Sequence, residues 1–357
     1  MTRRTTILAL ALLSTCFGLG PVAAQTPAPA TPPAYELNDS HLHLTNYIQE
    51  GTDIRKFLDI MGTRVGRVAL FGIPLQQEWS YRNAGDNPPK YYLESDSPLY
   101  YYSFTDAWIA SAYKSLPLEQ QARFDPMITG FNPADMYAAD HIKRVLKVFP
   151  GVFTGIGEFT VHKEFVSGKV AGDVASLDDP ALDRILDFCA ESGLLVILHS
   201  DFDTPYPKPE VAPAYLAQMK ALFRRHPKTT IIWAHMGIGR VVRPVEHHTA
   251  LLEELIKDPA FSNLYFDISW TEVADKVVKR ADDFAELINR HPDRFLFGTD
   301  EVAPATQQAY LRIYSIYEPL WKLLTPVASE KVRKGNYEHL FDEARHRVRA
   351  WEQAHLN

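Results

Sequence analysis

The sequence has few cysteines and lacks a long apolar run, and both features limit its class. It contains only Cys16 and Cys189, which excludes a cysteine-based zinc cluster. The apolar run near the N-terminus, Ile7–Leu13, is too short to span a bilayer. We find no heptad pattern, repeat or low-complexity block. The remaining composition, 46% hydrophobic and 23% charged, is typical of a globular protein.

The sequence also lacks an excess of positive charge. Its formal net charge is −7, and two of its 37 basic residues, Arg3 and Arg4, lie in a segment that we expect to be removed. The other 35 basic residues then face 44 acidic ones, which gives a net charge of −9. Such a surface repels phosphate backbones, so we expect no nucleic-acid partner and disfavour a nuclease.

The first 24 residues have the pattern of an export signal. A basic start precedes the apolar run, and Val22–Ala24 offers the small residues that a signal peptidase needs. We therefore predict a signal peptide at 1–24, a periplasmic or secreted protein, and no membrane attachment after cleavage. The alternatives are an uncleaved anchor or a lipid on Cys16, although Thr15 stands where a smaller residue is usual.

Residues 25–34 contain four prolines and predict an extended linker, followed by one folded domain at 35–357. In that domain short apolar runs alternate with amphipathic stretches, which predicts a single (β/α)₈ barrel. A doubly wound sheet is the rival, but a Gly-rich phosphate turn is lacking after the first strand. The predicted strands are Glu36–His43, Val65–Ile73, Pro126–Phe131, Val152–Phe159, Leu194–Ser200, Thr230–Met236, Asn263–Ser269 and Arg294–Asp300. The predicted helices include Ile54–Met61, Ala139–Val148, Ala181–Glu191, Ala214–Arg225, His247–Lys257 and Asp282–Asn289, and Gly193 is a predicted C-cap.

Polar residues stand at the carboxyl ends of the predicted strands, which meet at one mouth of such a barrel. His41 and His43 are two residues apart on a strand, so both can face inward and bind one metal ion. Each polar residue alone is weak evidence, because strand-end histidines are usually hydrogen-bonded and strand-end aspartates often cap helices. Together they predict a metal site. The further candidate ligands are Glu158, His199, His235 and Asp300, whereas Asp267 ends the seventh strand outside the predicted ligand set.

With these motifs in place, the sequence resembles the amidohydrolase superfamily over Glu36–Phe341. It is most similar to the amidohydrolase family 2 branch, which also contains decarboxylases and lactonases. The resemblance rests on Asp39-Ser40-His41-Leu42-His43, His199, Ala234-His235-Met236-Gly237, Gly298-Thr299-Asp300 and the terminal Gly335–Phe341.

The resemblance implies metal ligation by His41, His43, His199 and Asp300. It makes His235 a ligand in two-metal members or a catalytic group in one-metal members. It places Glu158 where two-metal members have a ligating carboxylate. The alternative for Glu158 is a buried acid paired with Lys163 or His162.

Imidazoles and carboxylates suit Zn²⁺, which we expect as one or two ions, and also Mn²⁺ or Fe²⁺. A metal-activated water, with Asp300 as general base and His235 polarising the carbonyl or protonating the leaving group, predicts hydrolysis of an amide, ester or lactone. The alternative in the same superfamily is decarboxylation of an aromatic or enoic acid. A third class, a non-catalytic binding protein, would show a broken ligand set, and none of the ligands is missing.

A long aromatic-rich insertion follows the second predicted strand, from Ile73 to Trp108, and should lie over the mouth. Its rings, including Trp79, either contact a small organic substrate or pack the insertion onto the barrel. Arg240 could bind a substrate carboxylate or form a salt bridge, and Trp270 is a further candidate contact. We expect His247 and His248 on the surface. The substrate is not readable from the sequence, and a homo-oligomer is an open alternative.

Overall fold

A parallel sheet forms the centre of the folded domain. The computed structural model describes residues 35–356 except 103, 173–174, 209–210 and 243–246, so the predictions for 1–24 and 25–34 lie outside the described residues. The strands follow the order β10-β9-β8-β7-β6-β5-β2-β1-β11. Their bounds are β1 Leu37–His43, β2 Val65–Phe71, β5 Phe124–Ile128, β6 Gly155–Thr160, β7 Leu195–His199, β8 Ile231–Trp233, β9 Leu264–Asp267, β10 Phe295–Leu296 and β11 Glu301–Val302.

The stretch that contains β10 and β11 closes this sheet into a barrel. β10 pairs with β9 and β11 pairs with β1, both in parallel. Between them the backbone N–H of Ser40 donates to the Phe297 carbonyl at 3.1 Å, and that of Asp300 donates to the His41 carbonyl at 2.7 Å. One stretch thus binds both edges of the sheet. The predicted (β/α)₈ barrel is confirmed, with the eighth strand divided into two short pieces.

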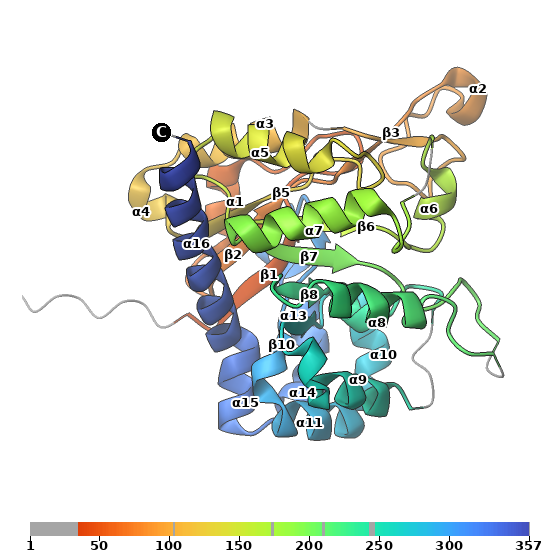
Figure 1. The fold of residues 1–357 in the computed structure, drawn as a ribbon, viewed down its shortest axis with the longest axis vertical. Coiled ribbons are helices and arrows are strands. Elements are labelled where there is room, and N and C mark those ends of the chain that lie inside the picture. Colours follow the sequence, from red (N-terminus) through yellow and green to blue (C-terminus); the bar gives the residue numbers. More distant parts are fainter. Residues whose placement is uncertain (1–34, 103, 173–174, 209–210, 243–246, 357) are drawn as a thin grey trace, which may run out of the picture. The chain divides into compact units, whose positions relative to one another are not determined.

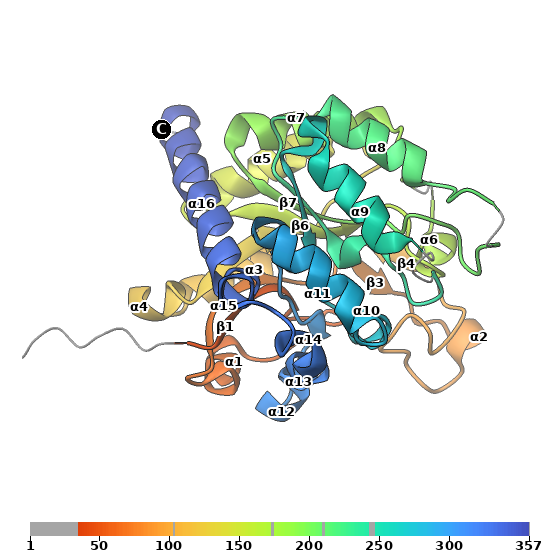
Figure 2. The same ribbon diagram turned by 90° about the horizontal axis from the view of Figure 1, so that it is seen from below.

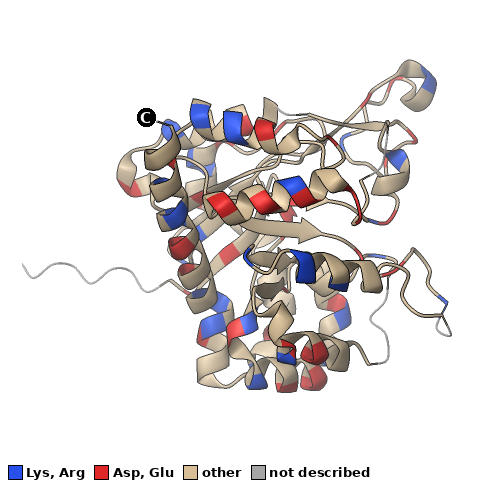
Figure 3. Ribbon diagram, in the orientation of Figure 1, with Lys and Arg blue, Asp and Glu red and all other residues tan. Residues whose placement is uncertain are grey.

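Helices surround the strands on the outside of the barrel (Figures 1 and 2), and most charged residues fall on them (Figure 3). No helix in the described part of the chain is both long enough and apolar enough to cross a membrane. The longer helices are α1 Ile54–Met61, α3 Phe104–Lys114, α5 Ala138–Val148, α7 Pro180–Ser192, α8 Leu216–Arg225, α9 His248–Lys257, α10 Thr271–Val278, α11 Ala281–Arg290 and α16 Asn336–His355. The shorter ones are α2 Tyr81–Ala84, α4 Leu118–Gln121, α6 Val166–Lys169, α12 Gln307–Tyr310, α13 Arg312–Ile316, α14 Glu318–Trp321 and α15 Pro326–Glu330.

Local signals set the helix ends where the sequence predicts them. The Asp53 carboxylate accepts hydrogen bonds from the backbone of Arg55 and Lys56, which fixes the start of α1. Helix α7 ends at Gly193 with φ 79°, a left-handed conformation that favours glycine. The predicted C-cap is therefore confirmed.

The insertion after β2 is a small hairpin with an exposed tip. Its strands β3 (Leu75–Gln77) and β4 (Leu99–Tyr101) pair antiparallel, and α2 lies at the end of the arm that projects in Figure 1. Tyr92 is 1% exposed and packs against Tyr47 and Tyr91, with ring centroids 5.4 Å and 4.5 Å away. The rings at the base of the insertion therefore pack it onto the barrel. Tyr81 at its tip is 75% exposed.

A charged network closes the barrel at the amino ends of its strands. The buried Asp125 carboxylate accepts hydrogen bonds from Arg67 at 2.8 Å, Arg345 at 2.5 Å and the Tyr337 hydroxyl at 2.7 Å. Tyr337 and Arg345 belong to α16, which thus binds to the start of β5. Every oxygen of this buried carboxylate has a cationic or hydroxyl donor, as a stable buried charge requires.

The structure corrects one surface prediction. His247 is exposed, as expected, but His248 is fully buried and its ring packs against Phe202 at 5.2 Å. Helix α9 begins at His248, and this first residue faces inward. Burial lowers the pKa of His248 to about 4, so its ring is neutral at pH 7.

Candidate metal centre

Six predicted ligands come together at the carboxyl ends of the strands. Ligand atoms of His41, His43, Glu158 and Asp300 lie within 4.8 Å of one another, and those of Glu158, His199 and His235 form a second such group. Glu158 belongs to both groups, so the cluster is continuous. All six side chains are nearly or fully buried.

The hydrogen bonds of the first-strand histidines leave one nitrogen of each facing the cluster. The Nδ1 atom of His41 lies 3.0 Å from Asp267 Oδ2, and that of His43 lies 3.1 Å from the Gly72 carbonyl. A proton on Nδ1 leaves Nε2 as the lone-pair donor in both rings. His43 Nε2 lies 3.1 Å from Asp300 Oδ1, while His41 Nε2 is buried without a hydrogen-bond partner.

His235 follows β8 rather than ending it. The predicted strand Thr230–Met236 stops at Trp233, and the chain turns at His235 with φ 57°. Its backbone N–H donates to Asp267 Oδ1 at 2.9 Å, and its Nδ1 lies 2.9 Å from Ser269 Oγ. This turn leaves His235 Nε2 buried, without a hydrogen-bond partner and 3.5 Å from Glu158 Oε1.

Glu158 has contacts that suit a metal ligand and also contacts that suit a buried acid paired with Lys163. Its Oε2 lies 3.3 Å from His43 Nε2, and its Oε1 lies 2.5 Å from His199 Nδ1. The same Oε1 lies 3.5 Å from Lys163 Nζ. Glu158 thus sits in the cluster and also pairs with Lys163, whereas His162 stacks on Tyr215 at 3.8 Å instead.

Nearby positive groups stabilise the charged form of two carboxylates. Burial alone would raise the pKa of Glu158, but Lys163 and His199 hold it well below its ordinary value. At Asp300 burial is likewise outweighed, chiefly by His41, and the pKa falls to about 2. Both groups are therefore ionised at neutral pH, which is the form that binds a cation.

The pKa of His235 is raised to about 9, because Asp267 and Glu158 outweigh the effect of burial, which alone would lower it. Four buried imidazoles beside several carboxylates must either hold extra protons or share a cation. The buried, unpartnered Nε2 atoms of His41 and His235 point to the second solution, since a divalent ion replaces protons on imidazole nitrogen. The residues present thus fit a divalent metal ion.

Two acids that hold ligands were outside the predicted set. Asp267 contacts His41 and the backbone of His235, and Asp201 Oδ1 lies 3.2 Å from His199 Nε2. Such carboxylates fix the orientation of ligand imidazoles. The position of Asp267 at the end of β9 was the available signal. Nothing in the sequence ranked it above the other strand-end residues.

The three predicted substrate contacts have different surroundings. Trp270 is 8% exposed, and its ring centroid lies 5.1 Å from that of His235. The Arg240 guanidinium lies over Trp270 at 5.2 Å, but it is paired with Glu164 and Glu272. Trp79 is 56% exposed and its indole N–H donates to Gly85 within the insertion, so the structure does not bring it to the cluster.

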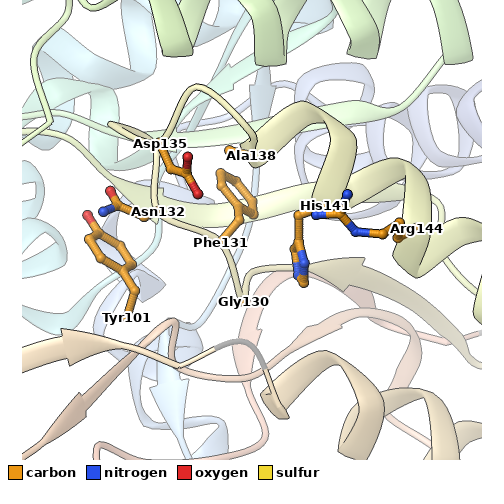
Figure 4. A pocket seen from close by; sticks show the side chains of 8 residues that line it. All are labelled: Tyr101, Gly130, Phe131, Asn132, Asp135, Ala138, His141 and Arg144. Atoms are coloured by element: carbon orange, nitrogen blue, oxygen red, sulfur yellow. The ribbon is translucent and has the colours of Figure 1, made fainter.

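A separate pocket of about 190 Å³ lies beside the loop between β5 and α5 (Figure 4). Its lining contains none of the six clustered ligands. The lining residues are Tyr101, Gly130, Phe131, Asn132, Asp135, Ala138, His141 and Arg144. The pocket is thus not part of the metal centre.

The chain belongs to the amidohydrolase family, whose model, described as "Amidohydrolase", matches residues 39–342. The match begins in β1 and ends in α16, so it includes every residue of the cluster. The family assignment inferred from the strand-end motifs is confirmed. No curated protein sequence matches the chain significantly.

Solved structures share the barrel at low sequence identity. An uncharacterised TIM-barrel protein from Bordetella bronchiseptica is 16% identical, with a TM-score of 0.53, 86% of this chain covered and 99% of the other. An amidohydrolase from Burkholderia multivorans with bound HEPES is 12% identical, with a TM-score of 0.52, 87% of this chain covered and 99% of the other. At these identities the likeness shows the fold alone.

Proposed function

We propose that this chain is a metal-dependent hydrolase that cleaves an amide, ester or lactone bond in a small organic substrate. The observation that carries the proposal is the convergence of His41, His43, Glu158 and Asp300 ligand atoms within 4.8 Å. This donor set suits Zn²⁺, with Mn²⁺ or Fe²⁺ as substitutes. His199 and His235 extend it through Glu158, which provides the donors for a second ion.

A bound divalent ion would lower the pKa of a water molecule towards ~7 and polarise a carbonyl group. Asp300 is ionised at neutral pH and lies beside His43, so it can accept the proton that the attacking water loses. His235 Nε2 faces the same cluster from the turn after β8. With a single ion bound, this nitrogen is free to donate a hydrogen bond to the carbonyl oxygen or a proton to the leaving group, whereas with two ions it would be a ligand.

Metal content and turnover test this proposal together. The purified protein is loaded with Zn²⁺, Mn²⁺ or Fe²⁺, and ion stoichiometry is measured by elemental analysis. A panel of esters, lactones and amides is then assayed for hydrolysis, and a panel of aromatic acids is assayed for release of CO₂. We expect turnover that chelation abolishes and metal restores. A chain that holds no ion, or hydrolyses none of the panel, argues against a hydrolase.

The contact between Lys163 and Glu158 favours a second candidate, a decarboxylase acting on an aromatic or enoic acid. If Lys163 holds Glu158 away from ligation, the remaining donors suit a single ion, which would orient the substrate. One tightly held ion per chain together with CO₂ release would replace the hydrolase by this lyase. Two ions per chain would favour hydrolysis.

We also propose that the protein is exported, on the basis of its N-terminal sequence pattern. The experiment is expression of the full chain in a Gram-negative host, followed by fractionation and N-terminal sequencing. A mature protein that starts at Gln25 in the periplasm or medium would support a signal at 1–24. A full-length chain retained in the cytoplasm would reject it.

A further inference from the structure

A second group of charged and aromatic residues lies next to the metal centre. The Lys163 ammonium and the Arg240 guanidinium both lie over the Trp270 ring, 5.4 Å and 5.2 Å from its centroid. Trp270 in turn packs against His199 and His235 of the cluster. Trp270 thus separates Arg240 from these two histidines, whereas Lys163 also contacts a predicted ligand directly, with its Nζ 3.5 Å from Glu158 Oε1.

Arg240 already has compensating charges. Its Nε lies 3.4 Å from Glu164 Oε2, a second nitrogen contacts Glu272, and Nη2 donates to the Tyr91 hydroxyl at 2.9 Å. Two carboxylates and a phenol therefore hold this guanidinium in place. These contacts match the salt-bridge alternative for Arg240 and make it a weaker candidate for binding a substrate carboxylate.

Lys163 is different, because its only carboxylate partner within 4 Å among the described residues is Glu158. An ammonium group has three N–H donors. When Glu158 and Asp300 share their charge with a divalent ion, the positive charge of Lys163 loses most of its compensation. A buried ammonium in that state attracts an anion strongly, since desolvation strengthens the Coulomb interaction.

Aromatic side chains lie near the same ammonium group. The ammonium lies over the Trp270 ring, 5.4 Å from its centroid, and Tyr47 and Tyr92, which pack on each other at 5.4 Å, interact with its charge electrostatically. Among the described residues the buried Tyr92 hydroxyl has no hydrogen-bond partner, so it is a candidate donor for a ligand oxygen. A cation with a phenol donor and flat apolar rings is a suitable site for a planar organic acid.

We infer that Lys163 is a substrate-binding residue and that the substrate carries a carboxylate close to its reacting bond. This inference rests on the proposed function and specifies its substrate class. The inference also gives the base of the insertion a role in substrate binding, because Tyr92 belongs to the insertion. The carboxylate would lie between Lys163 and Tyr92, with the planar body against Trp270.

The test is calorimetric binding of two probes, benzoate and its neutral analogue benzamide, to zinc-loaded protein. We expect wild type to bind benzoate ~10-fold or more tightly than benzamide. Lys163→Met should reduce that preference by ~10-fold while zinc content stays unchanged, and Lys163→Arg, which keeps the charge, should retain part of it. The matched control is Lys56→Met on the exposed face of α1, which should behave like wild type.

Two results would overturn the assignment. One is zinc-replete K163M with the wild-type preference for benzoate, which would place the anion on the metal ion instead. The other is wild-type protein that binds both probes equally, a comparison that needs no variant to fold. Zinc content is measured on the same samples. Protein without zinc refutes the proposed function, whereas zinc-replete protein with an unchanged preference refutes only the role of Lys163.

Discussion

The two ends of the barrel differ in how completely their buried polar and charged groups are hydrogen-bonded. At the amino end of the strands Asp125 is surrounded by Arg67, Arg345 and the Tyr337 hydroxyl, and each contact is a hydrogen bond. At the carboxyl end, two imidazoles, those of His41 and His235, keep a buried nitrogen without a partner. The paired end supports the fold. The incompletely paired end has donors that fit a cation, and this difference supports the proposal that the functional site lies at this mouth.

Removal of both histidines of the first strand should have the largest effect at the carboxyl end of the barrel. We expect His41→Ala with His43→Ala to abolish metal binding and activity, because two of the converging nitrogens disappear. The charged network at the other end is untouched, so the barrel should remain folded. Elemental analysis measures the metal and circular dichroism the fold. Full metal occupancy in this variant would contradict the ligand assignment.

Replacement of Asp300 by asparagine tests chemistry separately from binding. The amide oxygen can still ligate, but it accepts no proton, so we expect kcat to fall about 10³-fold with metal retained. The measurement is steady-state turnover on metal-replete protein. Turnover within a few-fold of wild type would remove Asp300 from the general-base role.

Asp267 lies behind the ligands, and its replacement should have an intermediate effect. Asp267→Asn weakens the hold on His41 and on the His235 backbone, so we expect metal affinity to fall about 10- to 100-fold. Competition with a chelator measures it. The control is Asp342→Asn, which removes an exposed partner of Arg67 and should leave metal affinity unchanged. An equal loss in both variants would indicate a general folding defect.

At the opposite end, Asp125→Asn should affect stability and leave the metal centre intact. It removes the charge that Arg67 and Arg345 share, and we expect the free energy of unfolding to fall by about 2 kcal/mol. Denaturant unfolding of the metal-free protein measures this loss. If metal affinity fell as well, the two ends would not be independent.

A third buried acid gives the smallest predicted effect. Asp106 accepts hydrogen bonds from the backbone of Thr129 and Gly130, and burial raises its pKa to about 7. A raised pKa means that its contribution to stability is complete below pH 4 and disappears as the pH rises towards 7. The free energy of unfolding of wild type minus that of Asp106→Asn should therefore be more positive at pH 5 than at pH 8. An equal difference at both pH values would show that Asp106 does not titrate in this window.

The sequence was sufficient for the barrel because strand and helix periodicity repeats along the chain. Helix α1, for example, has the predicted bounds Ile54–Met61. The strand ends were less predictable where tertiary contacts decide the backbone. His235 lies in a turn because its N–H binds Asp267, a residue 32 positions away. No local pattern contains that bond.

The candidate site divides in the same way. The six predicted ligands stand at or near predicted strand ends, where the sequence pattern indicates them, whereas the roles proposed for Lys163 and Asp267 depend on contacts with residues far away in the chain. The sequence predicts Lys163 only as a possible partner of Glu158, because its position over Trp270 depends on two separate loops. The surface prediction for His248 is wrong because a shift of one residue along α9 changes whether a side chain faces solvent, as at His247, or the core, as at His248.

The divided eighth strand has a consequence for how the site is held. Asp300 lies in the short gap between β10 and β11, and its amide is tied to the His41 carbonyl on the neighbouring strand. The first and last parts of the barrel are therefore joined through a residue that is also a predicted ligand of the cation. Any motion that opened this seam would separate Asp300 from His41 and His43, so loss of the ion and loosening of the barrel should occur at the same place.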